Sequence, residues 1–236
     1  AAVYVIIACV AHAAASSRRA KERETQALAL AAGLTRAKLD ALRLQLQPHF
    51  LFNTLNALSA LVHRDPRAAD ELIADLSELL RLSLESSANE VPLRRELEIL
   101  DRYLAIEQTR LGDRLRVTRD IDPAVLEVLV PTFILQPLAE NAVRHGIEPR
   151  CEPGHVTITA RAVGDLLELT VGDDGVGLRP AAQGARRGIG LTNAEERLRT
   201  LHGERARLEL RSPETGGVAV VVTLPRRQGA GKDVAA

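Results

Sequence analysis

The chain has 236 residues, of which 46% are hydrophobic and 26% are charged. These proportions suit one large or two modest globular cores and exclude extensive disorder. The 31 basic residues balance the 31 acidic ones, and only 2% of residues are aromatic, so we expect no nucleic-acid binding. The cysteines, Cys9 and Cys151, have no disulfide or metal-ligand spacing and fit a reducing cytoplasm.

An apolar run opens the chain. Residues 1–17 carry no Asp, Glu, Lys or Arg, and Arg18 and Arg19 follow directly. A bilayer span needs about 20 apolar residues, and basic residues flank such spans on the cytoplasmic side. We therefore expect the end of a transmembrane helix that starts before Ala1, with the following residues in the cytoplasm. A buried helix or an interfacial anchor is the alternative.

A heptad-like pattern follows in residues 18–47. Apolar or small side chains recur in steps of four and three, at Leu28, Ala32, Thr35, Leu39, Leu42 and Leu46. This spacing is typical of a parallel coiled coil, which would hold two chains together as a homodimer. The alternative is an amphipathic helix packed within one chain.

The string PHFLFNTLN, which begins at Pro48, places a histidine on the polar side of an otherwise apolar helix. At about 100° per residue, His49 shares a face with Asn53 and Asn56, and leucines occupy the opposite side. We expect His49 to be exposed, and its neutral imidazole would be a usable nucleophile. The alternative is a histidine that only hydrogen-bonds a neighbour.

Two further helices are expected at 65–84 and 92–111, each with a proline at its start. After Gly112 the pattern changes to short β-rich runs, with helical stretches at 134–145 and 191–202. The expected strands are 114–121, 155–163, 166–173, 206–212 and 217–225. This pattern indicates a second, α+β domain that is followed by a disordered tail.

The first constellation with chemical meaning is Glu140-Asn141 followed by Arg144-His145. On a helix, Asn141 and His145 share a face at i, i+4. An amide oxygen is a suitable Mg²⁺ ligand, and a basic side chain one turn later is able to meet a phosphate. Alone, the pattern is also typical of a solvated helix face.

Two glycine-containing strings complete the set. Asp173 ends an expected strand, and Gly175 and Gly177 follow it. A buried carboxylate accepts a hydrogen bond from an adenine amine, and glycines let the backbone approach a ligand, although such a string is often only a turn. Gly188 and Gly190 precede the last helix, and the free backbone N–H groups at a helix start are able to bind phosphate oxygens. The alternative is that these glycines only mark an ordinary loop.

Four strings in this order, PHFLFNTLN, LQPLAENAVRHGI, DDGVG and GIGLTNAEERL, resemble the histidine, Asn, first-glycine and second-glycine boxes of the LytS-type sensor histidine kinases. The resemblance covers about residues 38–225, and VPLRRELEILDRYLAIEQTRLGDRL resembles the linking helix of that family. It implies an α+β two-layer sandwich of the GHKL (Bergerat) ATPase type, joined to an α-helical dimerisation hairpin, in a protein of the cell inner membrane.

The resemblance also implies roles by position. ATP would phosphorylate His49, and the phosphoryl group would pass to an aspartate of a response regulator. Asn141 would coordinate Mg²⁺, Asp173 would receive the adenine amine, and Gly175 and Gly177 would begin a mobile lid. The other expected nucleotide contacts are Arg144, His145, Gly188, Gly190, Leu191 and Asn193.

These expectations divide the chain into five segments. They are the end of a transmembrane helix (1–17), a coiled-coil signalling helix (18–47), a dimerisation and histidine phosphotransfer region (48–112), an ATP-binding catalytic domain (113–225) and a disordered tail (226–236).

Some positions depart from the family's pattern. Phe50 follows the histidine where many histidine kinases have an acidic proton acceptor, so Glu140 is a candidate general base. Asp174 and Arg144 stand where Asn and Lys are commoner, which should change the affinity for the nucleotide. Arg179, Arg186 and Arg187 either clamp the triphosphate or are solvated.

Two alternative functions stay open. One is a dimeric scaffold that only binds ATP, and the other is an ATPase that uses Glu140 to activate water.

Overall fold

The computed structural model describes residues 48–85, 88–177, 189–213 and 216–227. The expected membrane-helix end and coiled coil both lie outside the described residues. In the part of the chain that is described, no helix combines the length and the apolar character needed to cross a membrane.

The described N-terminal part is helical. It contains α2 (Pro48–Arg64), α3 (Pro66–Glu85) and α4 (Leu93–Leu111). Asp65 separates α2 from α3 and caps α3, because its carboxylate accepts the Ala68 N–H at 3.1 Å. Helix α3 packs along α4, where Asp75 and Arg102 form an ion pair at 2.9 Å. The helices expected at 65–84 and 92–111 are therefore confirmed.

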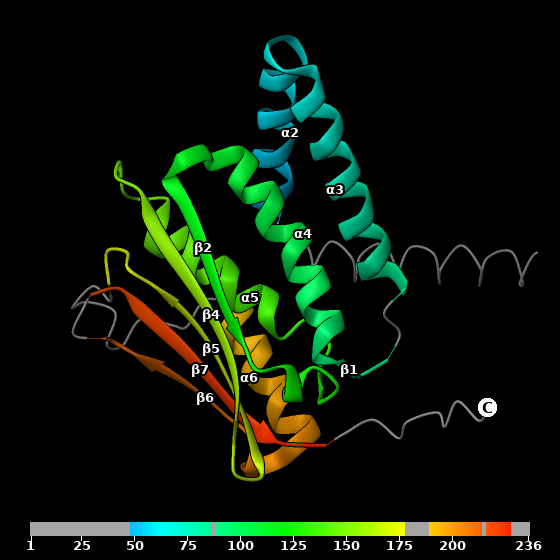
Figure 1. Cartoon of the computed structure of the whole chain (residues 1–236), viewed down its shortest axis with the longest axis vertical. Coiled ribbons are helices and arrows are strands. Elements are labelled where there is room, and N and C mark those ends of the chain that lie inside the picture. Colours follow the sequence, from blue (N-terminus) through cyan, green and yellow to red (C-terminus); the bar gives the residue numbers. More distant parts are fainter. Residues whose placement is uncertain (1–47, 86–87, 178–188, 214–215, 228–236) are drawn as a thin grey trace, which may run out of the picture. The chain divides into compact units, whose positions relative to one another are not determined.

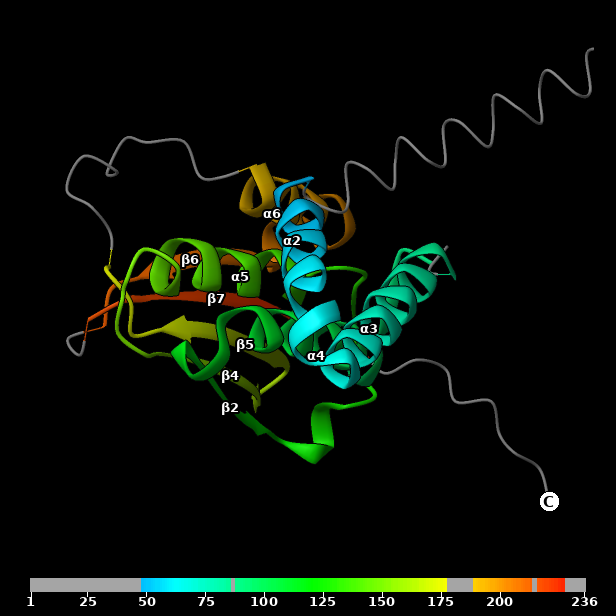
Figure 2. The same cartoon turned by 90° about the horizontal axis from the view of Figure 1, so that it is seen from above.

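The second half of the chain forms a mixed five-stranded sheet in the order β2-β4-β5-β7-β6. Its strands are β2 (Leu115–Ile121), β4 (Gly154–Val163), β5 (Leu166–Asp173), β6 (Arg207–Arg211) and β7 (Val218–Pro225). Strand β2 is parallel to β4, and the other neighbours are antiparallel. Helices α5 (Leu135–Asn141) and α6 (Ile189–His202) lie on one face of the sheet (Figures 1 and 2). The expected two-layer sandwich and its strands are confirmed.

Strand β5 shows how sequence alternation places the core. Leu167, Leu169 and Val171 are at most 1% exposed and face the helices, whereas Glu168 points to the other face. Burial of each such apolar side chain contributes about 1.5–3 kcal/mol relative to exposure. Asp173 is the last residue of the buried row, so the alternation carries a carboxylate to the helix-covered face.

Two short strands were not predicted. Strands β1 (Glu90–Pro92) and β3 (Leu129–Pro131) pair antiparallel in a separate two-stranded sheet. Three residues are too few to show alternation, so these strands depend on tertiary pairing rather than on a sequence pattern. Strand β1 precedes α4, and β3 lies beyond the expected boundary between residues 112 and 113. The pairing of β1 with β3 therefore joins the two expected segments.

The helical stretch expected at 134–145 is only partly an α-helix. Helix α5 ends at Asn141, and a π-helix spans Ala142–Ile147, where the Glu148 N–H donates to the Val143 carbonyl at 2.8 Å. The i→i+5 pattern widens the turn. The turn from Asn141 to His145 is therefore π-helical rather than α-helical, whereas the shared face of the two side chains stays a prediction.

Backbone hydrogen bonds hold the end of the described chain. The Arg226 N–H donates to Asp165 at 2.9 Å, and the Arg227 carbonyl accepts the Leu129 N–H at 2.7 Å. Residues 228–236 of the expected tail lie outside the described residues.

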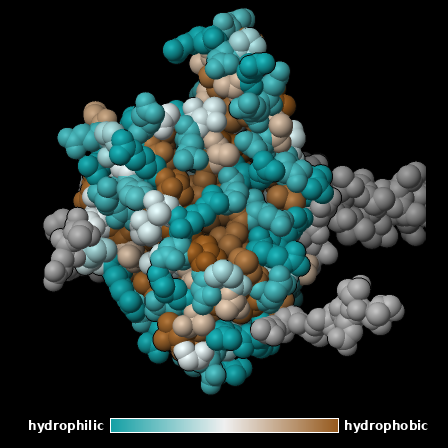
Figure 3. All heavy atoms as spheres, viewed as in Figure 1, coloured by the Kyte–Doolittle hydropathy of each residue, from teal (hydrophilic) through white to brown (hydrophobic). Residues whose placement is uncertain are grey.

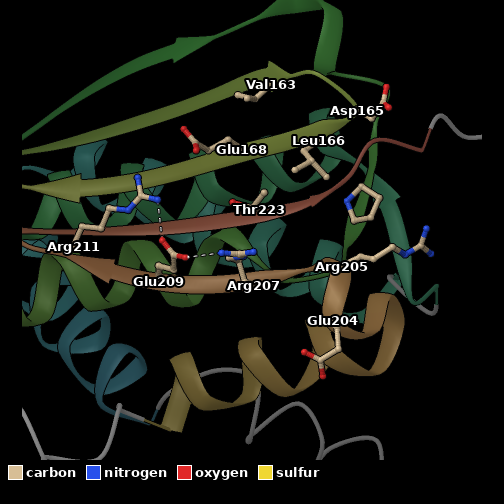
Figure 4. A pocket seen from close by; sticks show the side chains of 11 residues that line it. Val163, Asp165, Leu166, Glu168, Glu204, Arg205, Arg207, Glu209, Arg211 and Thr223 are labelled. Atoms are coloured by element: carbon tan, nitrogen blue, oxygen red, sulfur yellow. Dashed lines mark hydrogen bonds and ion pairs between the residues drawn. The ribbon is translucent and has the colours of Figure 1, made fainter.

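The sheet face opposite α5 and α6 is open and largely polar. Hydrophilic residues cover most of the side of the molecule that is seen in Figure 3, with apolar patches between them. A cavity of about 550 Å³ lies on the open sheet face, where Glu209 forms ion pairs with Arg207 at 3.3 Å and Arg211 at 2.8 Å (Figure 4). Because Asp173 belongs to the other face, this cavity is separate from the candidate nucleotide site.

Candidate functional site

His49 lies on the first turn of α2 and is exposed, as its spacing predicted. The apolar side of the same helix is only partly covered. Leu55 and Val62 are 52% and 47% exposed. A single copy of the chain therefore presents both a histidine and apolar surface on this helix.

Asp173 occupies the end of β5 and is 7% exposed. Burial raises the pKa of its carboxyl group, and hydrogen bonds from the Gly175 and Val218 N–H groups only partly offset this effect. The bond from Gly175 reaches Oδ1 at 2.9 Å. The next residue, Asp174, is exposed and accepts the His155 N–H at 2.7 Å. Of the two neighbouring carboxylates, that of Asp173 is therefore buried, and that of Asp174 is exposed.

Three glycines enclose Asp173. A Cβ on Gly146 would overlap the Asp173 carboxylate, one on Gly217 would overlap the Asp173 carbonyl, and one on Gly175 would overlap the Gly146 backbone. A side chain at position 146 would fill the space beside the carboxylate, whereas one at 175 or 217 would collide with the backbone next to it. Gly175 was predicted, whereas Gly146 and Gly217 were missed. A glycine within a helical segment, where it is unfavourable, was the available signal for Gly146.

Replacing Gly217 with Ala should destabilise the chain more than replacing Gly216 with Ala. Both glycines have positive φ, +77° and +94°, but only the Cβ at 217 would meet backbone atoms. The shared φ penalty cancels in the comparison, and overpacking should cost Gly217→Ala about 1–3 kcal/mol more. Chemical denaturation would measure the difference, and equal unfolding free energies would contradict the close packing at Asp173.

Glu140 is buried near the end of α5, at 8% exposed. Its Oε1 accepts a hydrogen bond from the Gln136 amide at 3.1 Å. Burial raises its pKa to about 7, the Glu107 carboxylate acts in the same direction, and Arg144 opposes it. A carboxyl group that titrates near neutral pH is suited to proton transfer.

The other predicted residues of this segment lie close to solvent. Asn141 is half-buried, and Arg144 and His145 are exposed. Partial burial and the Arg144 charge lower the pKa of His145. The segment therefore offers an amide oxygen and two basic side chains at the edge of the helix layer.

The second-glycine string lies at the start of α6. Gly190 is half-buried, Leu191 is buried and Asn193 is exposed. Gly177 has a φ of +71° and begins the expected lid. Gly188 and the three lid arginines lie outside the described residues.

Helix α4 contributes three polar side chains, Tyr103, Glu107 and Arg110, that were not predicted from the sequence. Tyr103 and Glu107 are each 3% exposed, and Arg110 forms ion pairs with Glu107 and, at 2.6 Å, with Glu148. Burial raises the pKa of Tyr103, and the charges of Glu107 and Glu140 add to this effect. The available signal was the spacing of Tyr103, Glu107 and Arg110, which lie three or four residues apart and so share one face of the helix.

Two family models match the chain. Residues 37–115 match the histidine kinase family, and residues 130–228 match the histidine kinase-, DNA gyrase B- and HSP90-like ATPases. The sensor histidine kinase YpdA of Escherichia coli (strain K12) is 38% identical over 188 residues, which cover 76% of this chain and 33% of that protein.

Two further relatives are similar over comparable shares of this chain. The sensor histidine kinase YesM of Bacillus subtilis (strain 168) is 35% identical over 193 residues, covering 80% of this chain and 33% of that protein. The sensor protein LytS of Staphylococcus haemolyticus (strain JCSC1435) is 34% identical over 191 residues, covering 76% of this chain and 33% of that protein.

The sandwich fold and the matched regions define a chain with a histidine kinase region followed by an ATPase domain. Residues 37–115 belong to the histidine kinase family and residues 130–228 to the ATPase family, and the chain is similar to sensor histidine kinases, as the LytS-type resemblance predicted. It spans about a third of the length of the curated relatives it matches.

Proposed function

We propose that the chain is the kinase core of a two-component sensor. Its sandwich domain would bind ATP, His49 would accept the γ-phosphoryl group, and an aspartate of a response regulator would receive it next. The observation that carries the proposal is the buried Asp173, whose carboxylate lies beside Gly146 and Gly175 and whose backbone carbonyl lies against Gly217. A carboxylate in such a space is suited to accept the adenine amine while glycine backbone contacts the ring.

Magnesium fits the donors of this region. Asn141 is half-buried and offers an amide oxygen, which is a suitable ligand for this ion. Within the described ranges, no group of three or more His, Cys, Asp or Glu side chains could hold a metal. The ion would therefore also need phosphate oxygens of ATP, and it would neutralise their charge.

His49 would supply the nucleophile. A ring nitrogen forms a bond to the γ-phosphorus, the bond to the β,γ-bridging oxygen breaks, and ADP leaves. The phosphorylated imidazole gives up its N–H proton to a base, and Glu140 is the candidate because its pKa is about 7. Arg144, together with the backbone N–H groups near Gly190 and Asn193, would hold the phosphates.

A homodimer is the proposed assembly. Leu55 and Val62 on α2 and Ile73 on α3 are apolar and 45–52% exposed, and covering them would be favourable. Residues 1–17 and 18–47 would join this dimer to the inner membrane, and residues 48–112 and 113–225 would form the phosphotransfer region and the ATP-binding domain.

Incubation with Mg²⁺ and ATP labelled at the γ-phosphate should transfer the label to the chain. The attached phosphate should be lost in acid and retained in alkali, as expected of a phosphoramidate. Released phosphate without protein label would instead support an ATPase, for which the pKa of Glu140 is the favourable observation. ATP binding with neither product would support the scaffold.

A further inference from the structure

Glu96 of α4 caps a different helix. Its side chain is 1% exposed, and its carboxylate accepts the backbone N–H groups of Phe133 at 2.6 Å, Ile134 at 2.9 Å and Leu135 at 3.3 Å. These groups lie at the start of α5, whose own N-cap residue, Ile134, provides no side-chain hydrogen bond. Unpaired N–H groups at a helix start need acceptors, and here a distant carboxylate supplies them.

The capped segment is held in a demanding conformation. Phe133 has a φ of +59°, a value that non-glycine residues rarely adopt. The Thr132 hydroxyl donates to the Ala88 carbonyl at 2.7 Å, and Arg197 of α6 donates to the Thr132 carbonyl. Such a backbone persists only where surrounding contacts determine it. Glu96 of α4 provides three hydrogen bonds to this segment.

Helix α5 is so short that a displacement of its first residue would also displace its last residue. It has seven residues, and Glu140 and Asn141 are the last two. At 1.5 Å per residue the helix is about 10 Å long. A tilt at Leu135 would therefore displace Asn141, because so short a helix moves as one rigid element.

Helix α4, which carries Glu96, is part of the matched histidine kinase region. It packs along α3, with Asp75 and Arg102 in an ion pair. A shift of α4 would move the Glu96 carboxylate away from its three donors. Three N–H groups would then lose their acceptor in a buried place, which is costly.

We propose that Glu96 is a positioning residue that locks the start of α5 to α4, so that ATP affinity at the Asn141 end of α5 depends on the position of α4. The dependence of ATP affinity on α4 rests on the proposed function, since it requires a nucleotide at Asn141. The locking of α5 by Glu96 concerns the chain without nucleotide and does not depend on that function.

The test compares Glu96→Gln with Glu98→Gln. Both change one carboxylate of α4 to an amide, but Glu98 is exposed and pairs only locally, with Arg95 at 2.8 Å. The Phe133 N–H bonds one carboxylate oxygen, and the Ile134 and Leu135 N–H groups bond the other. The amide keeps one acceptor oxygen, so at least one of the three donors would face an NH₂ that cannot accept its bond. Two readouts are needed, namely hydrogen exchange of residues 132–141 without nucleotide and the Kd for ATP by calorimetry.

Glu96→Gln should speed exchange in 132–141 and weaken ATP binding, each by about 10-fold, because charged hydrogen bonds to a buried group are lost. Glu98→Gln should leave both unchanged. Glu96→Asp, which keeps the charge but shortens the reach, should give intermediate values, and it carries the test if Glu96→Gln does not fold.

The outcomes separate the two proposals. Unchanged exchange in a folded Glu96 variant would overturn the locking role, and faster exchange with an unchanged Kd would overturn the link to ATP affinity. A wild-type chain that does not bind ATP would overturn the proposed function and that link together, while its exchange pattern would still report on the cap.

Discussion

Replacing His49 with Gln should reduce autophosphorylation to below about 1% of the wild-type level, because the amide has no nucleophilic ring nitrogen. ATP binding should be unchanged, since Asp173 and its glycines belong to the ATPase domain. Label transfer from γ-labelled ATP measures the first quantity, and calorimetry measures the second.

His63 provides a matched control for this experiment. It is an exposed histidine on the last turn of the same helix, α2. His63→Gln should therefore label like the wild type. Label retained in His49→Gln, or phosphate found on another residue by mass spectrometry, would overturn the assignment of His49 as phosphoacceptor.

Replacing Asp173 with Asn should weaken ATP binding by about 2 kcal/mol or more, which is roughly 30-fold in Kd. Asn has the same size, but one acceptor oxygen becomes an NH₂ donor. Because Gly175 and Val218 already donate to this side chain, the amide would keep its oxygen towards backbone N–H groups and present its NH₂ to the adenine amine. Two donors would then face each other.

Asp165 is the control for this second experiment. It is exposed and lies in the turn before the other end of β5. Asp165→Asn should bind ATP normally, and both variants should show native thermal unfolding. Unchanged calorimetric binding in a folded Asp173→Asn variant would refute the adenine contact.

The local patterns of this chain were sufficient to predict most of its elements. Alternation placed Leu167, Leu169 and Val171 on one face and ended the strand at Asp173, because side chains in a strand point to opposite faces in turn. Helical spacing likewise predicted that His49 is exposed. These features depend on neighbours close in sequence, so they are visible without a structure.

Tertiary structure decided how the candidate site is enclosed. Glu96 contacts residues 37–39 positions away, and in the sequence it looked like an ordinary acid near a helix start. Gly146 and Gly217 matter because two distant backbones approach Asp173. The π-helix after Asn141 was likewise not predicted from the sequence pattern. The sequence alone determined most of the secondary structure and the residue types of the boxes, since these follow from periodicity and local chemistry. Only the fold decided which buried groups meet, because that depends on packing between segments far apart in the chain.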